Sequence, residues 1–274
     1  MPHYPCEVPL ELQHLLDVSQ RQQAQIETEK INKPTLWETI RFKLTTDWTY
    51  NSNAIEGSAM TFGDTLFFLQ EGLTVQGKPL KDHLDAQNHA EAVDILFEIV
   101  NQDRPISQRF IKEINALLLN GIKSTPAMTP DGRIVQKPAT PGQYKKQPNH
   151  VLQPDRSLHL YVDPVQVENE MEHLIQWIAK YTDMLPAPFV AAIAHYNMVR
   201  IHPFDDGNGR GARILMNIIL MKKRFIPAVI RNEQKQTYYQ TLRLADNGNL
   251  MPFVQFVTQH LLKTQEDILH DLQT

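Results

Sequence analysis

Apolar residues recur along most of the chain at the three- and four-residue spacing of a helix with one buried face. This spacing predicts a helix from Leu10 towards Ile31, and a second helix that begins at Pro34, because proline suits the first turn. The same pattern predicts further helices over residues 62–71, 82–101, 107–121, 164–181, 188–201, 209–223, 234–246 and 251–272. We therefore expect an all-α fold.

One stretch interrupts the helical pattern. Between Pro126 and Pro164 the sequence holds seven prolines in 39 residues, and proline both fixes φ and removes a backbone donor. Extended runs at Arg133–Lys137 and Ser157–Val162 suggest that this stretch forms a small hairpin between them, and a surface loop without strands is an equal alternative. A long loop inside a compact helical domain is often functional. The expected picture is a helical domain with one projecting hairpin.

Composition narrows the class of protein. Twenty-seven basic residues against 31 acidic ones give a net charge of −4, which argues against a surface built to hold nucleic-acid phosphates. Cys6 is the single cysteine, so the chain forms no internal disulfide and no cysteine-rich zinc cluster. The start resembles no secretory signal, and no run of 18 apolar residues occurs. We expect a cytoplasmic protein with neither nucleic acid nor membrane as partner.

The strongest chemical pattern is the twelve-residue run from His202 to Arg213, H-P-F-D-D-G-N-G-R-G-A-R. Apolar positions on both sides predict that it links two core helices, and Pro203 disfavours helical geometry at the residue before it. Its glycines suit a backbone that takes positive φ and lies close to a ligand. A helix beginning near Gly209 directs free N–H groups and its positive dipole end at the loop. This arrangement favours an anion, most simply a phosphate.

Charged side chains in the run favour a polyanion with a metal. Arg210 and Arg213 fall in the first turns of the second helix, where each opposes the dipole by roughly 0.3–1 kcal/mol unless an anion is bound. Asp206 alone would repel phosphate, but a carboxylate beside phosphate is a usual Mg²⁺ ligand. His202 titrates near neutral pH and suits a general base towards a hydroxyl. For any single residue, a structural role in a capped turn is the alternative.

The run resembles the motif of the Fic family, H-x-F-x-D/E-G-N-G-R-x-x-R, at every defined position, and the similarity extends from about Ser52 to Phe256. The resemblance implies a Fic-type helical domain with a small β-hairpin flap. It divides the chain into N-terminal helices with an inhibitory segment over residues 1–60 and a core over residues 61–274. The implied activity is that of a protein adenylyltransferase, which transfers AMP from ATP, with Mg²⁺, to a hydroxyl of a target protein. A homodimer is a further possibility.

The resemblance also assigns roles to individual residues. His202 is expected to be the general base, and Asp206 the Mg²⁺ ligand. The expected nucleotide contacts are Gly207, Asn208, Gly209, Arg210, Arg213 and, for the nucleobase, Tyr239. Core packing is an equal alternative for Tyr239. The target is expected along a flap within Gln147–Tyr161. Before the flap, Lys145 stands where relatives often carry an arginine.

A second motif spans Ser52 to Gly57. From spacing alone two interpretations are equal: Glu56 ends a helix before Gly57, or Asn53 caps a new helix with Glu56 as its third residue. The segment is similar to S/T-x-x-x-E-G/N, found in Fic proteins with an N-terminal inhibitory helix. In that group the glutamate pairs with the second arginine of the motif, here Arg213, and holds basal transfer low. Ser52, Glu56 and Gly57 are therefore predicted to be regulatory.

Other functions stay open at this point. The same site is compatible with removal of AMP from a modified protein, with transfer of another phosphate-linked group, or with a non-catalytic module that senses nucleotide. Retention of both His202 and Asp206 favours an enzyme, because a sensor needs no base. His195 lies two helical turns before His202, and a buried, hydrogen-bonded histidine is the expected role rather than half of a metal pair.

Overall fold

The structure is a computed structural model that describes residues 3–100, 102, 104–128, 133–149, 151–152 and 158–273. Its helices are α1 (Leu10–Asn32), α2 (Pro34–Ile55), α3 (Phe62–Glu71), α4 (Leu80–Ile99), α5 (Gln108–Leu118), α6 (Val167–Tyr181), α7 (Ala187–Ile201), α8 (Asn208–Lys222), α9 (Lys235–Asp246) and α10 (Met251–Gln273). The short 3-10 turns η1 (Pro164–Gln166) and η2 (Asn232–Gln234) lead into α6 and α9. The predicted all-α class is confirmed.

Two small hairpins follow α5. Strand β1 (Ser124–Met128) pairs antiparallel with β2 (Ile134–Pro138), and β3 (Val151–Leu152) pairs antiparallel with β4 (Leu158–His159). The expected pairing of Arg133–Lys137 with Ser157–Val162 is therefore wrong. Each run pairs instead with the strand just before it, because closing a short loop costs less chain entropy than closing a longer one.

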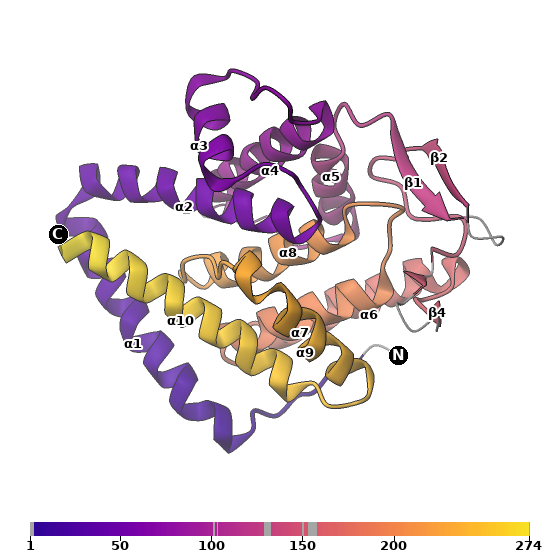
Figure 1. Ribbon diagram of the computed structural model, residues 1–274. Coiled ribbons are helices and arrows are strands. Elements are labelled where there is room, and N and C mark those ends of the chain that lie inside the picture. Colours follow the sequence, from indigo (N-terminus) through magenta and orange to yellow (C-terminus); the bar gives the residue numbers. More distant parts are fainter. Residues whose placement is uncertain are drawn as a thin grey trace.

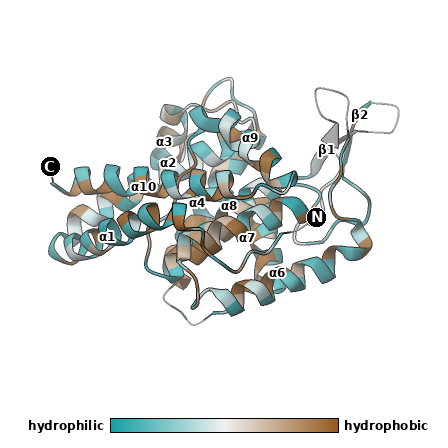
Figure 2. Cartoon of the chain, turned by 90° about the horizontal axis from the view of Figure 1, so that it is seen from below, coloured by the Kyte–Doolittle hydropathy of each residue, from teal (hydrophilic) through white to brown (hydrophobic). Residues whose placement is uncertain are grey.

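Helices α7 and α8 form the centre of the domain. Residues Phe189–Ala194 of α7 are wholly inaccessible to solvent, as expected for a helix that is apolar on every side. Helices α6, α9 and α10 pack on α7, whereas α2, α4 and α5 pack on α8, so that the α7–α8 pair lies between two layers (Figure 1). Figure 2 shows apolar residues gathered on α7 near the middle of the molecule. In the described ranges every helix is too short or too polar to span a bilayer.

Helix α2 begins at Pro34, as predicted, and its C-terminal end carries the second motif. It runs to Ile55 with Glu56 at its C-cap, and Gly57 takes a left-handed φ of 97° that ends the helix. The helix-end interpretation of Glu56 is therefore correct, and the alternative with Asn53 as an N-cap is wrong. Asn53 lies in the last turn of α2, and its Nδ2 donates to the carbonyl of Thr49 at 3.1 Å.

Candidate active site

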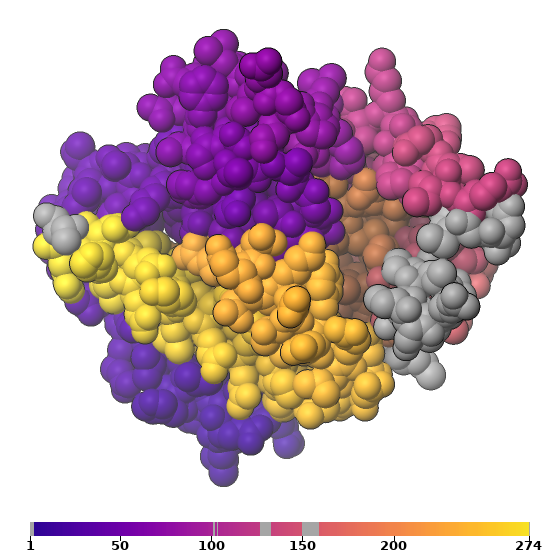
Figure 3. Space-filling model, in the orientation of Figure 1, coloured from indigo at the N-terminus to yellow at the C-terminus, as the bar shows by residue number. Residues whose placement is uncertain are grey.

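The loop between α7 and α8 is a tight turn with two left-handed residues. His202 ends α7 in the left-handed region, with φ 51° and ψ 59°, which residues other than glycine rarely adopt. Gly207 has φ 76° and precedes the first residue of α8. Phe204 is 1 % exposed and fixes the middle of the loop in the core. In Figure 3 the orange segment that carries this loop is visible between the purple N-terminal helices and the magenta hairpin.

Two buried amides hold the loop in shape. The Oδ1 of Asn208 accepts from the N–H of Phe204 at 2.9 Å, and its Nδ2 donates to the carbonyl of Phe204 at 2.7 Å. Asn115 from α5 donates to the carbonyl of Asp206 at 2.9 Å and accepts from the N–H of Gly142 at 2.9 Å. The side chain of Asn208 is thus engaged inside the loop, which leaves its backbone N–H for an anion. Sequence patterns did not identify Asn115, because its partners are distant in the chain.

The structure separates the two adjacent acids of the motif. Asp205 turns towards the first hairpin, where Lys137 lies 2.5 Å from its Oδ1 and the hydroxyl of Thr140 donates to its Oδ2 at 2.9 Å. Asp206 accepts from the next backbone N–H at 2.6 Å and lies 3.5 Å from Arg210. Its side chain keeps 27 % of its surface exposed. Asp206 is therefore the acid available to a metal beside α8.

The N-terminus of α8 holds a carboxylate from another helix. The N–H of Gly211 donates to the carbonyl of Gly207 at 2.8 Å, and the N–H groups of residues 208–210 precede this first helical bond. A Cβ atom on Gly209 would overlap the Oε1 of Glu56 and lie 3.1 Å from its Cδ. The missing side chain at Gly209 thus provides the space that the Glu56 carboxylate fills. The carboxylate of Glu56, the C-cap residue of α2, therefore lies at the N-terminus of α8.

Arg213 joins α8 to the second motif. It is 2 % exposed, its Nε donates to the hydroxyl of Ser52 at 3.0 Å, and its Nη2 donates to the carbonyl of the same residue at 2.8 Å. The same Nη2 lies 2.7 Å from the Oε1 of Glu56. Burial opposes the charge of Arg213, yet the Glu56 carboxylate leaves its pKa raised. The structure therefore brings together the arginine, serine and glutamate that the two motifs singled out.

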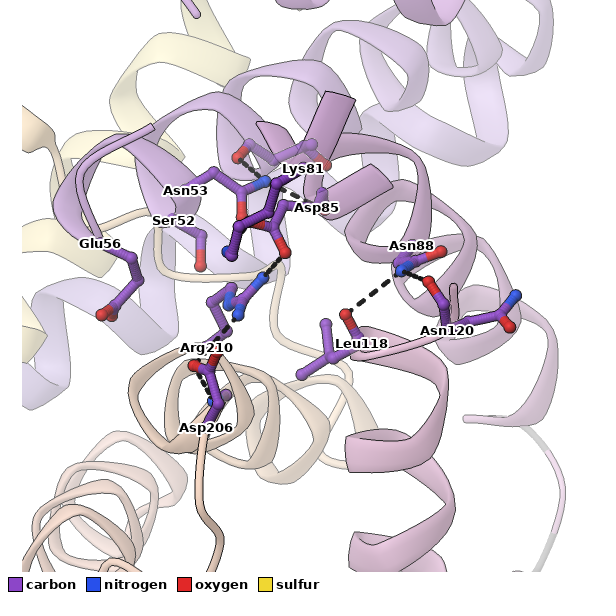
Figure 4. Close-up of polar contacts among 12 residues, drawn as sticks. Ser52, Asn53, Glu56, Lys81, Asp85, Asn88, Leu118, Asn120, Asp206 and Arg210 are labelled. Carbon is purple, nitrogen blue, oxygen red and sulfur yellow. Dashed lines mark hydrogen bonds and ion pairs between the residues drawn. The ribbon is translucent and has the colours of Figure 1, made fainter. Parts of the chain in front are cut away.

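Arg210 lies between two carboxylates. Its Nη1 forms an ion pair with Asp85 of α4, and its Nη2 lies 3.5 Å from Asp206 (Figure 4). Asp85 in turn lies 2.5 Å from the Nζ of Lys81. Asp85 and Lys81 were not predicted, since an acid and a base four residues apart on a helix usually form a surface pair. Here the pair reaches the motif and fixes the Arg210 guanidinium.

His202 carries a neutral imidazole. The ring is half-buried, and burial, reinforced by the positive charges of Lys145 and His159, lowers its pKa to about 3. The ring of Tyr161 lies 3.8 Å away between centroids. A neutral ring is free to accept a proton, as a general base must.

Lys145, where the family resemblance leads us to expect arginine, binds the backbone at the start of the loop. It is 3 % exposed, and its Nζ donates to Asn149 at 2.8 Å and to the carbonyl of Ile201 at 3.4 Å. Its backbone N–H donates to the carbonyl of Pro203 at 2.9 Å. Burial lowers the pKa of Lys145 to about 8. Lys145 therefore binds the backbone on both sides of His202.

The flap predicted within Gln147–Tyr161 contains β3 and β4, and residues 150 and 153–157 of it lie outside the described residues. Arg200 at the end of α7 donates to the carbonyl of Leu160, next to β4. Asp246 lies 3.8 Å from the Nε2 of His159 and 3.6 Å from the Nε of Arg200. Arg200 and Asp246 thus hold the described part of the flap beside the motif through contacts with Leu160 and His159.

Two aromatic neighbours complete the site. Tyr239 is 39 % exposed, so its ring lies at the surface, while the adjacent Tyr238 is buried at 2 %. Burial and the nearby Glu56 raise the pKa of Tyr239 to about 12.

His195 is wholly buried, and its Nε2 lies 3.2 Å from the hydroxyl of Tyr238, as expected for a structural histidine. In the described part of the chain no three metal-binding side chains cluster.

Comparison with known proteins agrees with this geometry. The model of the Fic/DOC family matches residues 105–220, which include the whole motif. Protein adenylyltransferase Fic of Nematostella vectensis is 32% identical over 212 residues, which cover 77% of this chain and 45% of that protein. Protein adenylyltransferase fic-1 of Caenorhabditis elegans is 30% identical over 220 residues, covering 78% and 39% respectively. The chain spans less than half the length of these curated relatives.

Solved structures show the same fold. A Fic domain containing signaling protein from Bacteroides thetaiotaomicron matches with a TM-score of 0.80 at 26% identity, over 92% of this chain and 97% of that one. Fic-1 of Caenorhabditis elegans matches with a TM-score of 0.73 at 24% identity, over 96% of this chain and 74% of that one. The chain belongs to the Fic/DOC family.

Proposed function

We propose that this protein transfers AMP from ATP to a hydroxyl side chain of a target protein, and that Glu56 holds the reaction back. One observation carries the proposal: an imidazole with a lowered pKa and a helix N-terminus beside the Glu56 carboxylate lie at the two ends of one short loop, residues 202–207. The first would accept a proton from the hydroxyl, and the second would bind the phosphates. The printed name of the curated relatives, protein adenylyltransferase, supports the same activity.

The nucleotide would lie along the N-terminus of α8. The N–H groups of Asn208, Gly209 and Arg210 would bind phosphate oxygens, because the terminus of a helix favours negative charge. Arg213 would bind the γ-phosphate in place of the carboxylate that it binds now. Tyr239, with its ring at the surface beside Glu56, would pack on the nucleobase.

Asp206 suits a Mg²⁺ ion. Its carboxylate is partly exposed beside the anion site, and an oxygen donor next to phosphates is the usual environment of this ion. When bound, Mg²⁺ would neutralise phosphate charge. Asn115 and Asn208 would keep Asp206 in place, since both bind the backbone of the loop that carries it.

In the reaction, His202 would take the proton of the target hydroxyl as its oxygen forms a bond to the α-phosphorus. The bond from the α-phosphorus to the oxygen that bridges to the β-phosphate would break, and pyrophosphate would leave. The negative phosphates would raise the pKa of His202 from about 3 towards neutrality, which makes it a better base once nucleotide is bound. The remaining catalytic power would come from positioning.

Glu56 would act as a brake by competition. Its carboxylate fills the space at Gly209 and binds Arg213, which are the two groups that the terminal phosphates need. ATP would then bind without its γ-phosphate on Arg213, and the α-phosphorus would lie out of line with His202.

The target would pair its backbone with the flap, which would present a hydroxyl with little regard to sequence. A homodimer stays a prediction.

Removal of AMP is the second candidate, and one observation favours it. The side chain of Glu56 keeps 38 % of its surface exposed, so its carboxylate can hold a water molecule while it binds Arg213. Mass analysis of a modified target separates the two directions: the forward reaction adds AMP and the reverse reaction removes it.

The test uses ATP labelled at the α-phosphorus and a lysate of the host. We would compare wild type, Glu56→Gly and the double variant Glu56→Gly/His202→Ala. The proposal expects weak labelling of proteins by wild type, strong labelling by Glu56→Gly and none by the double variant. Labelling by the double variant at the rate of Glu56→Gly would exclude His202 as the base.

A further inference from the structure

An aromatic ring covers the imidazole of His202. Tyr161, just after β4, lies with its ring centroid 3.8 Å from that of His202 and an angle of 41° between the planes. This separation is shorter than the usual 4.5–7 Å between paired rings, so the two tilted rings are in contact. The contact joins the flap to the first residue of the motif.

One nitrogen of the His202 imidazole is buried without a hydrogen-bond partner among the described residues. Its Nδ1 is inaccessible to solvent and makes no hydrogen bond with any described residue. In many enzymes a hydrogen bond at one ring nitrogen sets the orientation and tautomer of a functional histidine. In this site some other contact must hold the ring, and the ring of Tyr161 makes such a contact.

Tyr161 is itself held by several neighbours. The ring of His159 lies 4.7 Å from it, and the Nζ of Lys145 lies 5.8 Å from its centroid. Arg200 binds the carbonyl of the preceding residue, Leu160. These contacts come from β4, from the segment beneath the motif and from the end of α7, so the tyrosine is fixed before any nucleotide or target binds.

We propose that Tyr161 is a positioning residue, which fixes the plane of the His202 imidazole and shields one face of it from water. A tilted ring against one side of the imidazole would leave Nε2, the nitrogen that is not buried, to an incoming hydroxyl. The proposal rests on the proposed role of His202 as the base. Loss of the stacked ring would let the imidazole rotate, and misplacement by about 1 Å costs reactions up to a hundredfold.

The same ring affects protonation of His202. The titratable groups that face the imidazole are Lys145, His159 and Tyr161 itself. Burial is the largest of the influences that lower the pKa of His202. Water admitted by removing the ring would therefore raise this pKa towards its ordinary value, and the acidic limb of a pH–rate profile would move to higher pH.

Variants at position 161 test the proposal in the Glu56→Gly background. Tyr161→Phe keeps the ring, Tyr161→Leu keeps the bulk without the ring, and Tyr161→Ala removes both. Val165→Ala is the matched control, because this neighbour lies outside the flap and is 91 % exposed. The first readout is transfer from α-labelled ATP, and the second is the rate at which diethyl pyrocarbonate modifies His202, followed by peptide mass mapping.

We expect Val165→Ala to match the parent in both readouts, and Tyr161→Phe, which keeps the ring, to stay closer to the parent than Tyr161→Leu does. Tyr161→Ala and Tyr161→Leu should lower kcat by about tenfold to a hundredfold with KM for ATP unchanged, and should speed modification of His202. Equal kcat and equal modification rates in Tyr161→Leu and Tyr161→Phe would overturn the proposal. If no variant transfers AMP, the proposed function fails, and the modification rates alone still decide whether Tyr161 shields the imidazole.

Discussion

The contact between Glu56 and Arg213 allows the strength of the brake to be worked out. Glu56→Gln keeps the shape of the side chain and removes its charge, whereas Glu56→Gly removes the side chain altogether. If the carboxylate competes with the γ-phosphate for Arg213, both changes should raise the rate of AMP transfer, and the glycine variant should raise it more. The order of the three rates is the first prediction.

The magnitude follows from burial and distance. Arg213 is buried, and its Nη2 lies 2.7 Å from Glu56, so the contact is a charge-assisted hydrogen bond worth about 1.5–3 kcal/mol. Because 38 % of the Glu56 side chain is exposed, solvent screening places the contact near the lower end, about 1.5–2 kcal/mol. At 1.4 kcal/mol per factor of ten, Glu56→Gly should accelerate transfer about 10- to 30-fold. Glu56→Gln keeps a hydrogen bond from the Arg213 guanidinium without the attraction between opposite charges, and should give a smaller rise of about threefold.

The assay is the initial rate of label incorporation from α-labelled ATP, with Glu71→Gln as a control acid at the end of α3. Equal rates for wild type, Glu56→Gln and Glu56→Gly would refute the brake. A rise in Glu56→Gly with no rise in Glu56→Gln would show that bulk at Gly209, and not charge at Arg213, limits the reaction.

Three further predictions concern the motif itself. Asn208→Ala removes both hydrogen bonds to Phe204 and should lower the free energy of unfolding in urea by about 2 kcal/mol. Asp206→Asn, in the Glu56→Gly background, should raise the Mg²⁺ concentration needed for half-maximal transfer, since a neutral amide binds the ion less well. The pKa of His202 is about 3 in the folded chain and near 6.5 in the unfolded chain. Between pH 3 and 6.5 this histidine is therefore protonated in the unfolded chain and neutral in the folded one. The contribution of this group to the free energy of unfolding is thus complete above about pH 6.5 and is lost as the pH falls towards 3. His202→Gln should reduce the slope of unfolding free energy against pH in this range by up to about 1.4 kcal/mol per pH unit.

The helices could be predicted because their signals are local. The stretch 62–71 was predicted with the bounds that α3 has, and its capping box between Thr61 and Asp64 and the left-handed Gly72 show why. The run from His202 to Arg213 was likewise legible, since base, acid, glycines and arginines are adjacent in sequence.

Pairings between distant segments could not be predicted from the sequence. The strand partners after α5 were predicted wrongly, because extended runs rich in proline carry no register signal of their own. The end of α2 was undecided until Gly57 was seen to adopt positive φ. Asp85, Asn115 and Tyr161 reach the motif from α4, α5 and the flap, and only the packing of these elements reveals them.

The central claim is that the phosphates of ATP bind at Gly209 on the N-terminus of α8. Isothermal titration calorimetry of Mg²⁺-ATP with Glu56→Gly and with Glu56→Gly/Gly209→Ala tests it most directly, with Gly63→Ala as a control glycine, whose added Cβ would have no neighbour closer than 3.9 Å. The account predicts one binding site in Glu56→Gly and in the control, and an affinity at least about tenfold weaker when Gly209 gains a methyl group, since that atom fills the anion site. Equal affinity with and without the methyl group, or no binding to Glu56→Gly, would contradict it.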